Sequence, residues 1–183
     1  MTELTDWFSA LEAGDRDAFN RIFATLYPDL RHLARARLSQ GARLTLLDTS
    51  ALVHECYLRF LKCEIVGLAN RRHFFAYCSR VMRSIIVDAA RARRALQRGG
   101  DLTKVTLDTA HRDEIPEAED QVIELAEAID GLAKIDDRLA QTMELRLFGG
   151  FNEAEIAETL GVSDRTVRRD IEKARLLMAA SIR

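Results

Sequence analysis

The amino-acid sequence predicts an all-α protein. Apolar residues recur at the three- and four-residue spacing of helices along most of the 183-residue chain. The chain holds only two prolines and nine glycines, which disfavours a turn-rich all-β protein. No segment keeps up the apolar–polar alternation of a strand, apart from a weak pattern at residues 104–107. We therefore expect helices throughout.

Three short helical patterns open the chain. Gly14 and Asp15 separate the first from the second. Tyr27-Pro28 is expected to end the second, because a proline inside a helix removes a hydrogen bond and clashes with the preceding turn. The third pattern stops near Gly41.

Two longer helices follow. Asp48 or Thr49 is expected to cap the first, whose apolar residues run to Leu61. The second runs from Arg72 to about Arg98. These helices complete the N-terminal half of the predicted fold.

The C-terminal region predicts a helix-turn-helix. A helix over residues 139–148 ends at two glycines. Asn152 then stands three residues before Glu155, the spacing of a capping box that opens a helix over residues 153–160. Gly161 suits a tight turn, and Ser163 can cap a last helix that runs to about Met178. The expected core of this motif is Ile156, Ala157, Leu160, Val162, Val167 and Ile171.

The charged residues divide the chain into three blocks. Residues 1–100 hold 16 Lys and Arg against ten Asp and Glu, residues 101–131 hold two against ten, and residues 132–183 hold nine of each. This distribution indicates two modules and a linker, which we place at residues 1–98, 131–183 and 99–130. The acidic linker is either a solvated spacer or a segment that discourages the chain from folding back onto nucleic acid in the wrong register.

The overall composition excludes several classes of protein. Apolar residues make up 48% of the chain and the net charge is −2, which excludes a disordered chain. No apolar run approaches a membrane span, and residues 1–12 hold three acids and no base, unlike a signal peptide. Three cysteines without a C-x-x-C pair are typical of a reducing cytoplasm, where we expect this protein to act.

The last helix of the helix-turn-helix carries a basic face. Side chains at the start of such a helix reach base edges in the major groove, where arginine can bind guanine through two hydrogen bonds. The alternative is an ordinary helical hairpin with a solvated basic face. The predicted DNA-binding residues are Ser163, Arg165, Thr166, Arg168, Arg169 and Lys173.

The long helix of the N-terminal half has a second nucleic-acid signature. Residues 80–98 hold six arginines against the single acid Asp88, and Phe74, Phe75 and Tyr77 precede them. Aromatic rings beside a basic helix suit stacking on unpaired bases next to phosphate contacts. Each ring is alternatively part of the core.

The ordered set of motifs resembles the bacterial RNA polymerase sigma factors of the extracytoplasmic-function (ECF) type. Residues 52–59, LVHECYLR, resemble the family's L-V-Q-E-x-F-L-R signature in the helix that binds core polymerase. Residues 75–94 resemble the promoter-melting and minus-ten segment, and residues 150–167 resemble the minus-thirty-five helix-turn-helix. The resemblance covers nearly the whole chain.

This resemblance implies partners and roles. The partners are core RNA polymerase and promoter DNA, and a dedicated inhibitor (an anti-sigma factor) stays an open question. The implied polymerase-binding residues are Asp48, Leu52, Val53, Glu55 and Arg59. The implied minus-ten and melting residues are Phe75, Tyr77, Arg80, Arg83, Ser84, Arg91, Arg93 and Arg94.

The sequence departs from the family pattern at three places. Tyr77 stands where the family usually has tryptophan, and Ser84 where it has asparagine. Residues 48–51, DTSA, replace an acidic D-x-E-D segment that faces a basic surface of the polymerase. This resembles an ECF subgroup thought to be controlled by Ser/Thr kinases. Thr49 and Ser50 are the implied phosphorylation sites, because a phosphate supplies comparable negative charge; the alternative is that they only cap the helix.

A second function remains open from the sequence. The chain would then be a stand-alone helix-turn-helix regulator with an N-terminal sensor or dimerisation module, although a sensor has no need of a strand-melting surface. We expect no enzyme activity and no cofactor, since no catalytic constellation is present. We also expect no metal site, because paired ligands at zinc spacing are missing among His54, Cys56, Cys63, His73 and Cys78.

Overall fold

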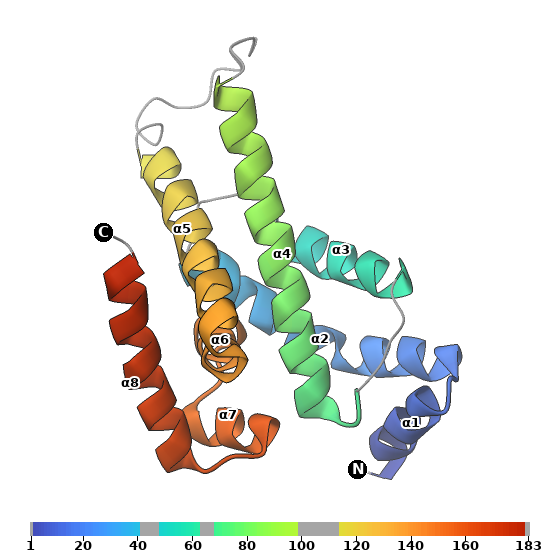
Figure 1. Cartoon of the computed structure of the whole chain (residues 1–183). Coiled ribbons are helices and arrows are strands. Elements are labelled where there is room, and N and C mark those ends of the chain that lie inside the picture. The colour runs from blue at the N-terminus through green and yellow to red at the C-terminus, as the bar shows by residue number, and fades with distance from the viewer. Residues whose placement is uncertain (1, 41–47, 63–67, 99–113, 182–183) are drawn as a thin grey trace.

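The computed structural model describes residues 2–40, 48–62, 68–98 and 114–181. Within these ranges the regular structure is helical and no strand occurs, so the predicted all-α class is confirmed (Figure 1). The elements are α1 (Thr2–Glu12), α2 (Arg16–Gln40), α3 (Thr49–Lys62), α4 (Arg71–Arg98), α5 (Glu114–Ile135), α6 (Asp137–Glu144), the π-helical turn η2 (Leu145–Gly149), α7 (Glu153–Leu160) and α8 (Asp164–Ser181).

The predicted break at Tyr27-Pro28 is wrong. Pro28 lies inside α2, which continues without interruption to Gln40. Leu26 and Leu30, on either side of the proline, are 2% and 0% exposed and belong to the same core. Pro28 and Ala24 face solvent, so water can bind the carbonyl that proline leaves without a partner. Packing on one face therefore outweighs the local cost of the proline.

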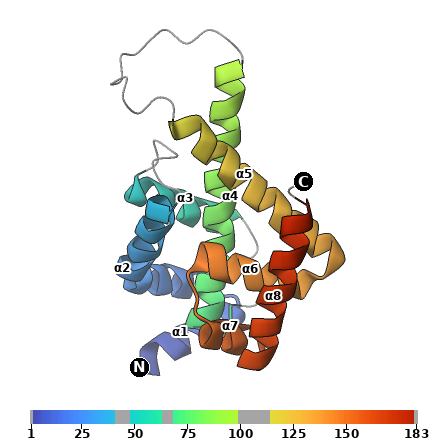
Figure 2. The same cartoon turned by 90° about the vertical axis from the view of Figure 1, so that its left-hand side faces the viewer.

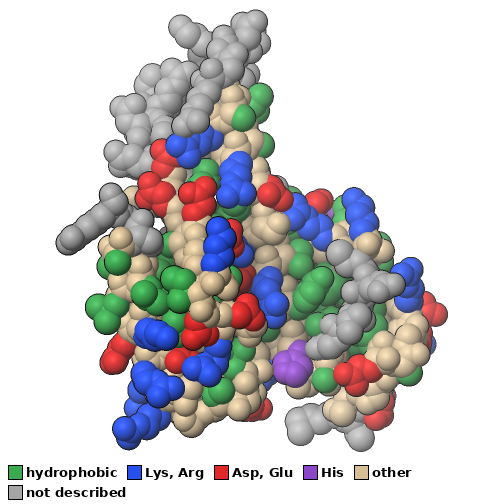
Figure 3. Space-filling view, in the orientation of Figure 1, with side chains coloured by type: hydrophobic (Ala, Val, Ile, Leu, Met, Phe, Trp, Pro, Cys, Tyr) green, Lys and Arg blue, Asp and Glu red, His purple; other side chains and the backbone are tan. Residues whose placement is uncertain are grey.

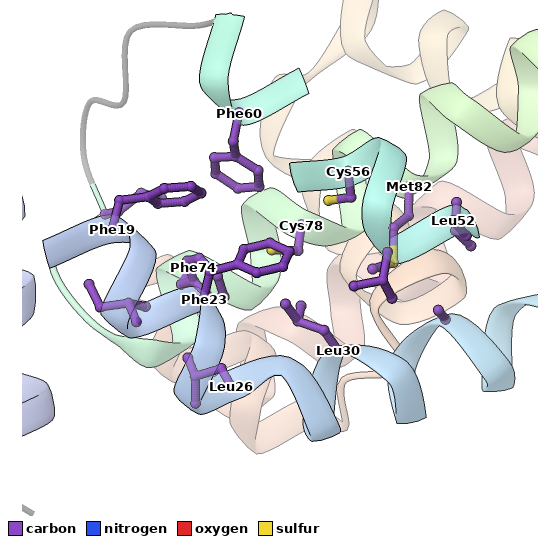
Figure 4. Packing of buried hydrophobic residues seen from close by; sticks show 14 of the residues in the cluster. Phe19, Phe23, Leu26, Leu30, Leu52, Cys56, Phe60, Phe74, Cys78 and Met82 are labelled. Carbon is purple, nitrogen blue, oxygen red and sulfur yellow. The ribbon is translucent and has the colours of Figure 1, made fainter. Parts of the chain in front are cut away.

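An aromatic core holds α1 to α4 together. Phe19, Phe60 and Phe74 are 0–2% exposed and come from α2, α3 and α4. Figure 4 shows these three rings side by side, with ring centroids 5.1 Å apart for Phe19 and Phe60 and 5.9 Å apart for Phe60 and Phe74. Such buried rings each contribute about 3–5 kcal/mol when compared with alanine. Phe74 is therefore a core residue.

The helix α4 packs on both halves of the chain. One side contributes to the aromatic core, and the other packs against α5 and η2 (Figures 1 and 2). Ala76 of α4 is 4% exposed and lies in one apolar cluster with Ile156 and Val167 of the helix-turn-helix. The neighbouring Ser79 is also buried, and its small size lets α4 approach Gly149 of η2.

The expected acidic linker differs from the structure in its second part. Residues 114–130 belong to α5, and Ile123, Ala126 and Ile129 are buried at the three-residue spacing of a helix face. Residues 99–113, with the weak strand pattern at 104–107, lie outside the described residues. The acids of α5 therefore sit on a helix that packs against α4, rather than on a solvated spacer.

The helix-turn-helix has the predicted geometry. Asn152 and Glu155 form both hydrogen bonds of a capping box, each 2.9 Å long, at the start of α7. Gly161 has a φ of 66°, a conformation that glycine adopts without strain, and so turns the chain into α8. Four of the six expected core residues are buried, and Leu160 and Val162 are partly buried against them.

No helix within the described ranges is both long enough and apolar enough to cross a membrane.

Replacing Asn152 with alanine should lower the free energy of unfolding by about 1 kcal/mol, because the N–H of Glu155 loses its acceptor. Urea unfolding followed by circular dichroism measures this change. Asn152→Asp is the matched control and should stay within a few tenths of a kcal/mol of the wild type, since aspartate accepts the same bond. An alanine variant as stable as the wild type would show that the capping box does not stabilise α7.

Candidate nucleic-acid interface

The first turn of α8 is fixed by Ser163. The carbonyl of Ser163 accepts hydrogen bonds from the N–H groups of Thr166 (2.9 Å) and Val167 (3.1 Å). The Ser163 hydroxyl also accepts a bond from the N–H of Thr166, at 3.3 Å. The cap predicted from the sequence is therefore present, and it sets where the basic face of α8 begins.

Basic side chains gather at this end of α8. Figure 3 shows Lys and Arg side chains at the lower end of the helix as it is drawn in Figure 1. Arg165, Arg168 and Arg169 are exposed and, with Thr166 and Glu172, line an open hollow of about 450 Å³. The buried residues Val167 and Ile171 hold the opposite side of α8 against α7. The arginines thus project from a rigid helix.

The basic residues of α8 differ in their partners. Nε of Arg168 donates to Glu153 at 2.7 Å, and Nζ of Lys173 lies 3.8 Å from a carboxylate oxygen of Asp136. Within the described part of the chain, neither Arg165 nor Arg169 has an ion pair. These two guanidinium groups are therefore available to a phosphate or a base edge without breaking an internal contact.

An ion pair between a buried aspartate and a partly exposed arginine joins α8 to α6. Asp170 is 2% exposed and accepts hydrogen bonds from Nε (2.6 Å) and Nη2 (3.3 Å) of Arg138. Sequence reasoning did not single out this pair. Because a planar guanidinium bound through two bonds fixes orientation, the pair sets the rotation of α8 about its axis.

The two aromatic side chains predicted to stack on bases are half-buried in α4. The ring of Tyr77 lies 4.8 Å from that of Phe60, centroid to centroid. The ring of Phe75 packs against Phe74 on one side, and the guanidinium carbon of Arg71 lies 5.5 Å from its centroid. Both side chains therefore make core contacts and stay partly exposed.

Arg83 of α4 lies between the two halves of the chain. Its Nε donates to Glu144 at 3.0 Å, and Nη1 and Nη2 lie 3.2 Å from the same oxygen of Asp130. A fourth bond, 3.4 Å long, runs from Nη1 to the carbonyl of Ala126. The Arg83 side chain is 19% exposed and that of Glu144 is 9% exposed. In this conformation Arg83 binds residues of α5 and α6, and most of its side chain is covered.

Three further arginines of α4 also pair with acids of the C-terminal half. The pairs are Arg91 with Glu127 (3.5 Å), Arg94 with Asp120 (3.3 Å) and Arg72 with Glu158. Among the other residues predicted to contact the minus-ten element, Arg80 and Ser84 are exposed and Arg93 is half-buried. The structure thus places the predicted residues on one helix but pairs several of them internally.

The sequence of the whole chain matches one known protein family. The family model described as "ECF sigma factor" matches residues 1–183. The chain belongs to the ECF sigma factor family. No match was found among curated proteins. Sigma factors of this family are regulatory factors that bind core RNA polymerase and direct transcription initiation at promoter DNA, and they are not enzymes.

The α3 helix of this sigma factor carries the residues expected to bind polymerase. Leu52 and Val53 are 0% exposed, so both side chains hold α3 in the core, which differs from the expectation of direct contact. Arg59 is bound internally, with Nη1 donating to Ser84 and Nη2 to Asp88, each at 2.8 Å. Arg59 therefore joins α3 to α4.

The start of α3 is capped by Asp48. Oδ1 of Asp48 accepts a hydrogen bond of 2.7 Å from the N–H of Ala51. Ser50 is exposed and Thr49 is half-buried in the same turn. Within the described residues neither the Thr49 nor the Ser50 hydroxyl caps α3. Asp48 caps the helix instead.

The cysteines and histidines of this sigma factor do not gather into a metal site within the described ranges. Cys56 and Cys78 are buried side by side between α3 and α4 (Figure 4). Burial, and then the hydrogen bond to Cys56, raise the pKa of the Cys78 thiol well above its usual range. A thiol that keeps its proton is a poor ligand for a metal. Cys63 lies outside the described residues.

The position of Glu144 predicts a pH dependence of stability. Burial raises the pKa of Glu144, and the nearby charges of Arg83 and Arg80 oppose this effect only in part. The folded chain therefore keeps the Glu144 proton to a higher pH than the unfolded chain does. The contribution of Glu144 to the free energy of unfolding is then largest below the ordinary pKa of 4.5 and falls as the pH rises through the raised value.

We expect the free energy of unfolding of the wild type minus that of Glu144→Gln to fall as the pH rises above 4.5. Urea unfolding of both proteins across this range measures the difference. Glu124→Gln, an exposed position of α5, is the control for the loss of one negative charge. A difference that rises with pH would show that the ion pair with Arg83 dominates over burial.

Proposed function

We propose that this sigma factor reads the minus-thirty-five element with the N-terminal end of α8. The observation that carries this proposal is the exposure of Arg165 and Arg169 at the start of a rigid, capped helix. When a helix-turn-helix binds DNA, the first residues of its second helix reach base edges in the major groove. An arginine can bind O6 and N7 of guanine together and so distinguish it from the other bases.

The other polar residues of α8 take positioning roles in this proposal. Ser163, Thr166 and Lys173 lie where they can bind phosphates on either side of the groove. Arg168 can release Glu153 and bind a phosphate or a base instead, because the ion pair between Arg168 and Glu153 lies at the surface and is weak. Phosphate contacts set the register of the helix, while base contacts set the sequence preference.

The minus-ten element is assigned to α4. Phe75 and Tyr77 are partly exposed and can stack on unpaired bases, and the arginines beyond them can bind the strand backbone. We keep residues 1–98 and 131–183 as the two functional modules, with α5 running from the connector into the second. The implied phosphate-binding residues of α4 are Arg80, Arg83, Arg91, Arg93 and Arg94, and Ser84 lies on the same helix.

The binding of core polymerase is assigned to the exposed side of α3. Asp48 is exposed at its start and Glu55 is partly exposed one helical turn beyond Ala51. Leu52 and Val53 act through packing, because they place this helix without reaching its surface. The single acid before the helix leaves little negative charge for a basic polymerase surface.

We further propose that phosphate at Thr49 or Ser50 supplies the missing charge and that a Ser/Thr protein kinase adds it. A phosphate carries about −1.5 to −2 charges, and the start of α3 favours negative charge through the helix dipole. Two observations support the proposal: Asp48 provides the cap, and Ser50 is exposed within the first turn.

The double variant Arg165→Ala/Arg169→Ala should abolish most promoter-directed transcription. We expect a loss of about fivefold to more than a hundredfold per base-reading arginine, since each such contact is worth about 1–3 kcal/mol. The measurement is run-off transcription from a library of genomic fragments, using core polymerase of the bacterium that encodes the sigma factor. Arg16→Ala/Arg21→Ala removes the same charge from exposed positions of α2 and serves as the control.

Unchanged transcription by the Arg165/Arg169 variant would show that α8 is not the reading helix. Transcription that falls equally in the α2 control would show that only net charge matters. A wild-type chain that directs no transcription with core polymerase, but binds particular duplex sites tightly by itself, would instead favour a stand-alone regulator.

Phosphate at Thr49 or Ser50 should raise the affinity for core polymerase by about tenfold or more, because it replaces acids that face a basic surface. Fluorescence anisotropy with labelled polymerase compares unmodified chain, chemically phosphorylated chain and the variants Thr49→Glu and Ser50→Glu. Thr49→Val and Ser50→Ala are the controls that remove each hydroxyl. Tight binding by the unmodified chain that phosphate does not improve at either residue would end this part of the proposal.

A further inference from the structure

Two ion pairs of opposite polarity join the start of α6 to α8, which packs beside it (Figure 2). Arg138 of α6 donates to Asp170 of α8 from Nε at 2.6 Å and from Nη2 at 3.3 Å. Just before α6, an oxygen of Asp136 lies 3.8 Å from Nζ of Lys173, and this second pair is longer and weaker. A shift of α8 by about one turn would place Lys173 opposite Arg138, where like charges repel.

The side chain of Arg138 starts from a fixed point of the backbone. Asp136 is the N-cap of α6, and its side chain accepts hydrogen bonds from the N–H groups of Arg138 (3.1 Å) and Leu139 (3.4 Å). The N–H of Asp136 donates to the carbonyl of Leu132 in α5, at 2.8 Å. Leu139 is fully buried and anchors the same turn in the core. The guanidinium group is therefore presented from a rigid corner between α5 and α6.

The carboxylate of Asp170 lies on the buried side of α8. Val167, Ile171 and Ala174, which are 0–6% exposed, surround this position on the helix. A carboxylate that leaves water loses free energy unless charged donors replace the water. Within the described residues, the hydrogen bonds to this carboxylate come from Arg138. The helix α8 is therefore held in the rotation that points Asp170 at Arg138.

The rotation of α8 also sets the direction of its exposed arginines. Arg165 and Arg169 are four residues apart and share a face, about 100–140° around the helix from Asp170. Side chains reach about 5–6 Å from a helix axis, so a rotation of about 20° moves their ends by about 2 Å. Two hydrogen bonds to one base do not survive such a movement, since donor and acceptor must stay about 2.7–3.2 Å apart.

We propose that Arg138 and Asp170 are positioning residues that determine which bases α8 reads. This rests on the proposed function, in which Arg165 and Arg169 contact bases of the minus-thirty-five element. Asp170 is a buried acid and has no means of binding a phosphate itself. Its effect on base preference therefore passes through the placement of α8.

The first test is Asp170→Asn in the full chain. Asparagine has nearly the same size, but its neutral oxygen accepts a weaker bond from a guanidinium than a carboxylate does. The complex of the full chain with core polymerase is mixed with a random duplex DNA library, and the retained fragments are sequenced. At the positions read by Arg165 and Arg169, we expect the preference for the selected base to fall about fivefold or more.

Asp137→Asn is the matched control for this substitution. Asp137 is exposed, lies next to Arg138 and accepts a hydrogen bond from Gln141 of its own helix. It therefore loses the same charge beside the same corner without touching α8. We expect its base preference to differ from that of the wild type by less than about twofold, because the placement of α8 is unchanged.

Two further variants separate positioning from stability. Arg138→Met/Asp170→Leu replaces both charges by apolar side chains of similar size, a change that is often neutral for stability. Circular dichroism and urea unfolding should match the wild type, while base preference falls, because apolar contacts lack the direction of two hydrogen bonds. Arg138→Lys keeps the charge but loses the planar fork, and should show the same fall in base preference. These two variants decide the question if Asp170→Asn does not fold.

Pulsed electron spin resonance measures the placement of α8 directly. Spin labels attached by bio-orthogonal chemistry at two exposed positions, Lys134 of α5 and Arg175 of α8, report the distance between these helices. We expect a single narrow distribution of distances in the wild type and a broader or shifted one in Asp170→Asn. Asp137→Asn should keep the distribution of the wild type.

The outcomes separate this proposal from the proposed function. Weaker binding of all sequences alike by Asp170→Asn, with an unchanged base preference, would show a purely structural role and overturn the proposal. An equal fall in Asp137→Asn, or a changed preference with an unchanged distance distribution, would overturn it as well. A wild type that retains no preferred sequence would show that reading by α8 is wrong. The distances would then decide whether the pair fixes α8, and an equally narrow distribution in Asp170→Asn would contradict it.

Discussion

The contact of Arg83 with Glu144 and Asp130 is the interaction on which the arrangement of the two halves depends. It joins α4 to α5 and α6 through bonds of 3.0–3.2 Å, and the Glu144 side chain is 9% exposed whereas that of Asp130 is 56% exposed. Removing one partner of such a covered pair costs about 3–5 kcal/mol, whereas each exposed pair along α5 adds about 1 kcal/mol or less. Among the ion pairs between the two halves, the one between Arg83 and Glu144 is therefore the strongest, and it adds to the apolar packing of α4 around Ala76.

This balance suits a subunit that binds and leaves the polymerase. A partner that binds with nanomolar affinity gains about 12 kcal/mol, more than enough to separate contacts of this strength. The two proposed DNA-binding surfaces differ in exposure: Arg165 and Arg169 of α8 are accessible, whereas the side chain of Arg83 of α4 is 19% exposed.

The features predicted correctly from the sequence depend on neighbours in the chain. The capping box at Asn152 and the turn at Gly161 need only residues within a few positions, and both were found as expected. Pro28 was misjudged because Leu26 and Leu30 pack into a core built by distant segments. The many acids of α5 led us to predict a solvated linker, although Ile123 and Ile129 form a buried helix face. The partner of Arg83 could not be predicted, because Glu144 lies 61 residues away in the sequence. The one sequence feature that could have indicated contacts between these segments was the charge balance of −8 over residues 101–131, which follow a basic helix.

The central claim is that α4 is shared between both halves in the free chain and released when polymerase binds. Fluorophores placed by bio-orthogonal labelling at two exposed positions, Arg21 of α2 and Arg175 of α8, report the distance between the halves by energy transfer. Our account predicts high transfer efficiency in the free chain and a clear fall on addition of core polymerase. The same efficiency with and without polymerase, under conditions where binding is complete, would contradict it.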